Sequence, residues 1–133
     1  MKKAISASLV LMILFVGCAS FGPKEPVIPP DIETFSGLSA ALERGDDFIL
    51  YDVRTREEYE RGHVPGAINI PHDVIAKKVP RKNRNKVIVV YCQSGGRSNM
   101  AYEALTEKKF NYVFDFGGVG NWDGSLVTGD SPE

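Results

Sequence analysis

Apolar runs alternate with amphipathic segments over most of the chain. Residues 48–53 and 87–91 are almost wholly apolar, and such runs predict strands that are covered on both faces of a sheet. Shorter runs at 67–70 and 112–116 predict two further strands. Because helical patterns separate these strands, the sequence predicts one α/β domain, a small parallel sheet with helices on both faces.

The helical patterns show apolar residues at the spacing of one helix face. They are found at 36–44, 55–61, 73–79 and 97–109. Thr55 can cap the second of these helices, with Glu58 at the position of a capping box. The buried side of the last helix is expected to consist of Met100, Ala101, Ala104 and Leu105.

The first residues have the layout of an export signal. Lys2 and Lys3 precede an uncharged, mostly apolar run at 4–16, which is too short to span a bilayer comfortably, since about 20 apolar residues are needed. The run ends in FVGC at 15–18, which resembles the lipobox of bacterial lipoprotein signal peptides, with Phe where Leu is usual. The resemblance implies cleavage before Cys18 and lipidation of its thiol. An ordinary cleaved signal and an uncleaved anchor are the alternatives.

These patterns divide the chain into four parts. They are a signal peptide at 1–17, the lipidated Cys18 with a Pro-rich linker at 18–31, a folded domain at 32–128 and a C-terminal tail at 129–133. Pro-rich segments favour extended polyproline II and act as stiff spacers. We therefore expect an extracytoplasmic protein on the periplasmic side, held on a membrane by its lipid anchor. Ala19 carries no inner-membrane retention acid, which leaves the outer membrane open as the location.

Charge and metal-ligand content exclude several function classes. The 133 residues carry 16 Lys and Arg against 17 Asp and Glu, a net charge of −1, which gives no electrostatic reason to expect nucleic-acid binding. Two cysteines rule out a four-cysteine zinc or iron–sulfur site. His63, His72 and Cys92 lack the spacing of metal ligands, so no metal or other cofactor is expected. His63 is expected to be a turn residue that bonds to the backbone.

The candidate chemistry follows the strongest predicted strand. Cys92 stands at its carboxyl end, which is the edge where open α/β sheets bind ligands. After it come Gln93, Ser94, Gly95, Gly96, Arg97 and Ser98. The two glycines can take positive φ, so that successive N–H groups of a short loop converge on one point before a helix begins near Arg97 or Ser98. Loop, helix N-terminus and Arg97 all favour thiolate over thiol, so we expect a lowered pKa for Cys92.

Three motifs resemble those of the rhodanese (sulfurtransferase) family. YCQSGGRS at 91–98 is similar to its active-site loop, DVRTREEYERGHVPGAINIP at 52–71 to its other diagnostic stretch, and GGVGNWDG at 117–124 to its closing segment. The resemblance covers about residues 32–128. It implies a small parallel α/β fold and transfer of a sulfane sulfur through a cysteine persulfide. Thiosulfate is the usual laboratory donor, and cyanide or a thiol accepts.

The resemblance also implies roles for these residues. Cys92 is the nucleophile, whose thiolate attacks the outer sulfur of the donor and expels sulfite. The loop at 93–98 binds the substrate, because its N–H groups cradle the persulfide and Arg97 orients the anionic donor.

Residues near these motifs are expected to support the site. Asp52 is expected to cap backbone N–H groups at a strand end. Arg54 is expected to pair with an acid such as Glu57 or Glu58, and Trp122 to be a packing anchor.

The same residues fit other functions. One alternative is a non-catalytic persulfide carrier that hands sulfur to a partner protein. A phosphatase or arsenate reductase is less favoured, because phosphatases on this scaffold have five residues between cysteine and arginine, whereas this chain has four, 93–96. The basic run at 77–86 is expected to be a solvated loop, with steering of anionic donors or contact with anionic lipid headgroups as alternatives.

Overall fold

The structure is a computed structural model that describes residues 22–133. The predicted signal peptide at 1–17 and the predicted lipidation site, Cys18, lie outside the described residues. Within the described part, no helix is both long enough and apolar enough to cross a bilayer.

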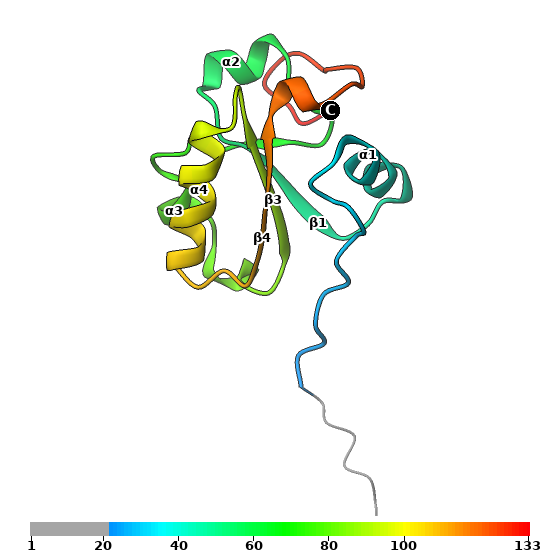
Figure 1. Ribbon diagram of the computed structural model, residues 1–133. Helices are drawn as coiled ribbons and strands as arrows, with labels where there is room; N and C mark the ends of the chain where they lie inside the picture. Colours follow the sequence, from blue (N-terminus) through cyan, green and yellow to red (C-terminus); the bar gives the residue numbers. More distant parts are fainter. Residues whose placement is uncertain (1–21) are drawn as a thin grey trace, which may run out of the picture.

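One parallel four-stranded sheet forms the centre of the domain, with strands in the order β2-β1-β3-β4 (Figure 1). The strands are β1 (Phe48–Asp52), β2 (Ile68–Asn69), β3 (Val87–Cys92) and β4 (Tyr112–Gly118). The helices are α1 (Phe35–Arg44), α2 (Arg56–Arg61), α3 (Ile75–Lys78) and α4 (Gly96–Glu107), with 3₁₀ turns η1 (Arg81–Asn83) and η2 (Val119–Asn121). The predicted α/β class, with a parallel sheet between helices, is confirmed.

Strand β3 is buried along its whole length because helices cover both faces of the sheet. Its side chains alternate between two core clusters, as the pleat of a strand requires. Val89 and Tyr91 pack on the side of α1, whereas Val90 and Cys92 pack on the side of α3 and α4. Among residues 22–133, both clusters draw only on Ile32 and later positions.

Local signals set the ends of the first two helices. The Thr34 hydroxyl accepts a hydrogen bond from the Gly37 N–H at the start of α1. At α2 the predicted capping box is confirmed, because the Thr55 hydroxyl accepts from the Glu58 N–H while the Glu58 carboxylate accepts from the Thr55 N–H.

Helix α4 differs from the prediction in its start and in its buried side. It begins at Gly96, one residue before Arg97, and its buried residues are Ser98, Ala101 and Leu105. The prediction for Met100 is wrong, since this side chain is 56% exposed. A short polar residue, Ser98, lies in the buried row because the loop before the helix turns that row toward Cys92.

The last residues of the chain return to α2. The His63 N–H donates to Val127 O at 2.9 Å, and the Gly66 N–H donates to Pro132 O at 2.7 Å. The two nitrogens of the His63 ring bond to Tyr59 O and Ser131 O, so the predicted backbone-bound role of this residue is confirmed.

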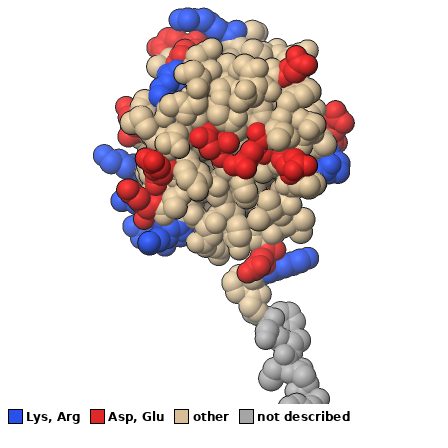
Figure 2. Space-filling view, in the orientation of Figure 1, with Lys and Arg blue, Asp and Glu red and all other residues tan. Residues whose placement is uncertain are grey.

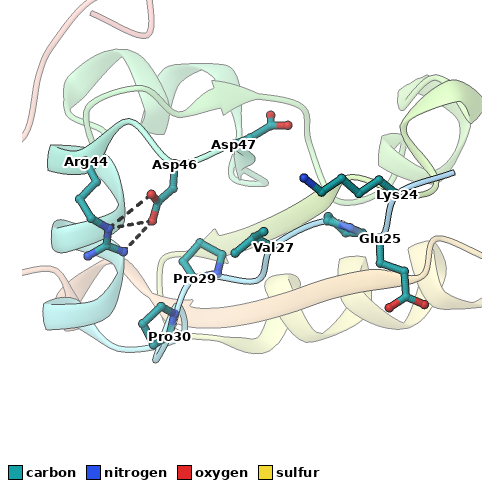
Figure 3. A pocket seen from close by; sticks show the side chains of 9 residues that line it. Lys24, Glu25, Val27, Pro29, Pro30, Arg44, Asp46 and Asp47 are labelled. Atoms are coloured by element: carbon teal, nitrogen blue, oxygen red, sulfur yellow. Dashed lines mark hydrogen bonds and ion pairs between the residues drawn. The ribbon is translucent and has the colours of Figure 1, made fainter. Parts of the chain in front are cut away.

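Most of the visible surface of the domain is uncharged, with Asp and Glu side chains across its middle and Lys and Arg side chains mainly at its edges (Figure 2). At the lower left of that view, Lys and Arg side chains gather where α4 ends. The Pro-rich segment runs beside the turn between α1 and β1, where residues 24–27, 29 and 30 line a cavity of about 580 Å³ together with Arg44, Asp46 and Asp47 (Figure 3). This cavity lies away from Cys92 and carries no candidate nucleophile.

Candidate active site

Cys92 is the last residue of β3, at the carboxyl edge of a central strand. A loop of three residues, Gln93 to Gly95, joins it to the first residue of α4. The side chain has no exposed surface, and it packs in the core cluster on the α4 side together with Ala101. The chain therefore places a thiol directly below the N-terminus of a twelve-residue helix.

The loop is shaped so that its N–H groups meet the sulfur. Gly95 has φ 101° and ψ −22°, and its N–H donates to Cys92 Sγ at 3.0 Å. Of the two glycines, only Gly95 takes positive φ, because Gly96 is already the first helical residue. The expectation that both glycines would bend the backbone in this way is wrong for Gly96.

The pKa of the Cys92 thiol is lowered, as predicted, and this is the net result of two opposing effects. Burial raises it, but hydrogen bonds from the Ser98 hydroxyl and from the N–H groups of Ser98, Ser94 and Gly95 stabilise the thiolate and outweigh burial. In the structure the Ser98 hydroxyl donates to Gly95 O at 3.0 Å. A hydroxyl has one hydrogen, so the thiolate competes with this carbonyl oxygen for it.

Arg97 is engaged by a carboxylate from another helix. Its two terminal nitrogens donate to the Glu58 oxygens at 2.7 and 2.9 Å, which holds the start of α4 against α2. The hydrogen bond from Arg97 holds the pKa of Glu58 down at about 2. Since Glu58 offsets the positive charge, Arg97 contributes less to the thiolate than the sequence suggested, and the loop N–H groups contribute more.

A buried polar network supports the loop from β1. Arg54 donates to the Asp52 carboxylate through Nη2 at 2.6 Å and Nε at 3.0 Å, and Tyr91 Oη donates to the same carboxylate at 2.8 Å. Asp52 is fully buried, so both partners are needed to satisfy its charge. Arg54 Nη1 donates to Gln93 Oε1 at 3.3 Å, which links the network to the loop after Cys92.

This network tests two predictions about the strand end. Asp52 Oδ1 accepts the Arg54 N–H at 2.9 Å, so its predicted role as a cap of backbone N–H groups is confirmed. The predicted pairing of Arg54 with Glu57 or Glu58 is wrong, because Arg54 turns into the core and pairs with Asp52. Glu58 is taken by Arg97 instead.

Two glycines that the sequence reasoning did not assign to the site lie at the end of β4. A methyl group added at Gly118 would stand 2.8 Å from Gln93 O and 3.1 Å from Ser94 Cα. Gly117 O lies 3.3 Å from the Ser98 hydroxyl. The loop after Cys92 therefore fits only against a strand that has no side chain at Gly118. The adjacent glycines at a strand end are the signal in the sequence that could have identified them.

A second cavity opens beside the loop. It has a volume of about 440 Å³ and is lined by Arg54, Glu58, Arg61, Gly62, Gln93, Val119 and Leu126. The lining holds two cations and one acid; since Arg54 pairs with Asp52 and Glu58 with Arg97, Arg61 is the lining charge without an ion-pair partner among the described residues. The predicted packing role of Trp122 agrees with its edge-on contact with Phe35, whose ring centroid lies 5.1 Å away. Among the described residues, no group of three His, Cys, Asp or Glu side chains could hold a metal ion.

The comparisons with known proteins agree on one family. Residues 34–125 match the Rhodanese-like domain family. The chain is 43% identical over 72 residues to the thiosulfate sulfurtransferase PspE of Escherichia coli K12. The aligned region covers 51% of this chain and 67% of PspE. It is 37% identical over 96 residues to YrkF of Bacillus subtilis, provisionally named a sulfur carrier protein. That match covers 71% of this chain, which spans about half (51%) of YrkF.

Solved structures show the same fold. A rhodanese with anions from E. coli matches with a TM-score of 0.58 and 34% identity, covering 61% of this chain and 98% of the other. A rhodanese-like domain protein from Staphylococcus aureus matches with a TM-score of 0.63 and 31% identity, covering 71% of this chain and 94% of the other. The match therefore covers almost the whole of the E. coli chain.

Proposed function

The chain belongs to the rhodanese-like domain family, whose relatives include named sulfurtransferases, and from this premise we propose that Cys92 carries a sulfane sulfur between a small anionic donor and an acceptor. The donor class is thiosulfate or a related sulfane compound, and the acceptor is cyanide or a thiol. The observation that carries the proposal is the short contact between the Gly95 N–H and Cys92 Sγ at the start of α4.

The proposed reaction has two balanced steps. The Cys92 thiolate attacks the outer sulfur of thiosulfate, a new S–S bond forms, and the old S–S bond breaks so that its electron pair leaves with sulfite. The product is an anionic Cys92 persulfide. Cyanide then attacks the outer sulfur, thiocyanate leaves, and the electron pair of the broken S–S bond returns to Cys92 as thiolate.

The loop supports both steps with fixed dipoles. The thiolate and the persulfide each carry one negative charge at this place, so the donors that lower the Cys92 pKa also suit the intermediate. Four residues separate Cys92 from Arg97, and such a tight ring suits a single sulfur atom. Since Cys92 has no exposed surface, the loop at 93–95 must open for the donor to enter from the cavity with Arg54 and Arg61.

Thiocyanate formation from thiosulfate and cyanide is the direct test. The chain is expected to turn over with ping-pong kinetics, and Cys92→Ala is expected to abolish turnover while the circular-dichroism spectrum stays unchanged. Intact-mass spectra after thiosulfate alone should show one added sulfur atom, which cyanide removes. Thiocyanate formation by the Cys92→Ala variant would overturn the proposal.

A persulfide carrier is the second candidate, and two observations favour it. YrkF bears the name of a sulfur carrier, and the buried sulfur of Cys92 would protect a stored persulfide from solvent. The mass measurement separates the two functions. A stable added sulfur that neither cyanide nor small thiols remove, but a partner protein does, supports the carrier.

We also propose that the protein is a lipoprotein on the extracytoplasmic side of a membrane, anchored through Cys18, with the folded domain at 32–128 joined to the anchor by the Pro-rich linker. The lipobox-like FVGC at 15–18 supports this proposal. Cys18→Ser is expected to abolish labelling by radioactive palmitate and to change membrane fractionation. Unchanged labelling and fractionation would refute the anchor.

A further inference from the structure

A basic cavity lies at the edge of the domain opposite the active site. It has a volume of about 270 Å³ and is lined by Ala76, Lys77, Val79, Arg81, Arg84, Lys108 and Phe110. Its residues come from α3, η1 and the segment after α4, close to where β3 begins. Cys92 is at the other end of β3, so the cavity is separate from the proposed chemistry.

The charge of this cavity is unbalanced. Four of its lining residues are cations and none is an acid. Within residues 22–133, none of these four cations forms an ion pair with a carboxylate. Figure 2 shows Lys and Arg side chains gathered over the end of α4. Like charges that are brought together repel, and a bound anion relieves that repulsion.

Arg84 provides a second and independent observation. Its Nε is buried and has no hydrogen-bond partner among the described residues, although buried polar atoms are nearly always satisfied. The backbone of Arg84 is fixed, because its N–H donates to Arg81 O and its carbonyl oxygen accepts from the Asn111 N–H at 2.9 Å. Because Arg84 lines the cavity, a small shift of its side chain toward a bound oxyanion would give this N–H the acceptor that it lacks.

We propose that this cavity binds an anion of the phosphate class, either free phosphate or the phosphate of a lipid headgroup. Two arginines can bind such an anion through the forked geometry of their guanidinium groups. The cavity is smaller than the pockets of roughly 300–1,000 Å³ that hold drug-sized ligands, and a small polar group suits it. Val79 and Phe110 form the apolar part of the lining, which limits access of water to the anion.

The position of the linker makes a lipid headgroup a nearby source. Pro23 and Lys24 line one small cavity together with Asn85 and Asn111, so the Pro-rich segment leaves the domain beside Arg84. Figure 1 shows the same arrangement, with the segment leaving at the end of the sheet where β3 and β4 begin. Five peptide steps from residue 23 to residue 18 reach at most about 18 Å. If Cys18 is lipidated as proposed, the cavity lies within reach of the bilayer; anion binding itself does not depend on the anchor.

The test compares two double variants in the chain from residue 22 to 133, which contains every residue of the two core clusters described above. Arg81→Gln with Arg84→Gln removes two charges from the cavity. Lys78→Gln with Lys82→Gln removes two charges from the same basic run outside its lining. Thermal unfolding checks that both variants fold, and Arg84→Lys keeps the charge while it removes the Nε donor.

Binding is measured by titration with inorganic phosphate and by co-sedimentation with vesicles. One set of vesicles is phosphatidylcholine alone, and the other also contains phosphatidylglycerol. Each lost charge-assisted hydrogen bond weakens binding roughly tenfold. The cavity variant is therefore expected to bind both probes at least about tenfold more weakly than the control variant, and Arg84→Lys is expected to fall between the two.

The outcomes separate the two sources of the anion. Phosphate binding that competes with binding to the anionic vesicles supports a headgroup site, and phosphate binding without vesicle binding supports a site for a free anion. Absence of phosphate binding would overturn the proposal. Equal losses in the two double variants would also overturn it, because that result means diffuse attraction by the basic run rather than a cavity.

Discussion

The two neighbouring glycines of the active-site loop offer a sharp test of how the loop works. Gly95 has φ 101° and donates its N–H to Cys92 Sγ, whereas Gly96 is the first residue of α4. A methyl group added at Gly96 meets nothing within 4 Å, and one at Gly95 comes only within 3.9 Å of Gly117 Cα. Gly95→Ala and Gly96→Ala thus differ in backbone conformation and hardly at all in steric contact.

The size of the effect follows from the backbone. A residue with a side chain costs about 1–2 kcal/mol in the left-handed region, and for a domain of this size each kcal/mol lowers the Tm by roughly 4–8 °C. If the loop relaxes to avoid this strain, the Gly95 N–H leaves the sulfur. Loss of one such donor costs about 10²–10³ in rate at comparable anion sites. Gly96→Ala restricts the unfolded chain at a helical position and is expected to raise the free energy of unfolding by about 0.4–1 kcal/mol.

Two measurements on each variant check this reasoning. Thermal unfolding gives the stability, and thiocyanate formation together with the pH dependence of Cys92 alkylation gives the state of the sulfur. Gly95→Ala is expected to lose stability or activity and to raise the thiol pKa. Gly96→Ala is expected to keep its activity and thiol pKa and to gain slightly in stability. Equal behaviour of the two variants would show that the Gly95 conformation does not hold the N–H on the sulfur.

Three further predictions concern the support of the loop and its sulfur. Arg54→Ala leaves the Asp52 charge buried without its partner, so urea denaturation should show a loss of about 3–5 kcal/mol, and an unchanged midpoint would contradict the role of the network. Gly118→Ala puts a methyl group 2.8 Å from the loop backbone and should reduce thiocyanate formation about 10²-fold, whereas Gly120→Ala, with nothing within 4 Å, should not. Alkylation of Cys92 by iodoacetamide should reach half its maximal rate below the ordinary thiol pKa of about 8.5. Because this pKa is lowered in the folded state, the thiolate stabilises the fold at pH values above the thiol pKa of the unfolded chain. This contribution is lost as the pH falls through the thiol pKa of the folded protein. An alkylation midpoint at or above the ordinary thiol pKa would contradict the lowered pKa.

Some elements of this domain can be predicted from short-range patterns in the sequence alone. The β-branched run before Cys92 predicts the central strand, since a run buried on both faces has few other solutions in an α/β protein. The capping box of Thr55 and Glu58 is likewise predictable, because both partners lie within one helical turn.

The tertiary structure decided which charged and small residues meet. Arg97 is 39 positions from Glu58, and Gly118 fits under a loop that follows a neighbouring strand. The unsatisfied Nε of Arg84 depends on which side chains close around it. Patterns of hydrophobicity fix which face of an element is buried, but the partner of a buried charge depends on packing between segments that the sequence separates widely. The same physics explains why Cys92 could be found from its own neighbours, while the residues that hold its loop in place could not.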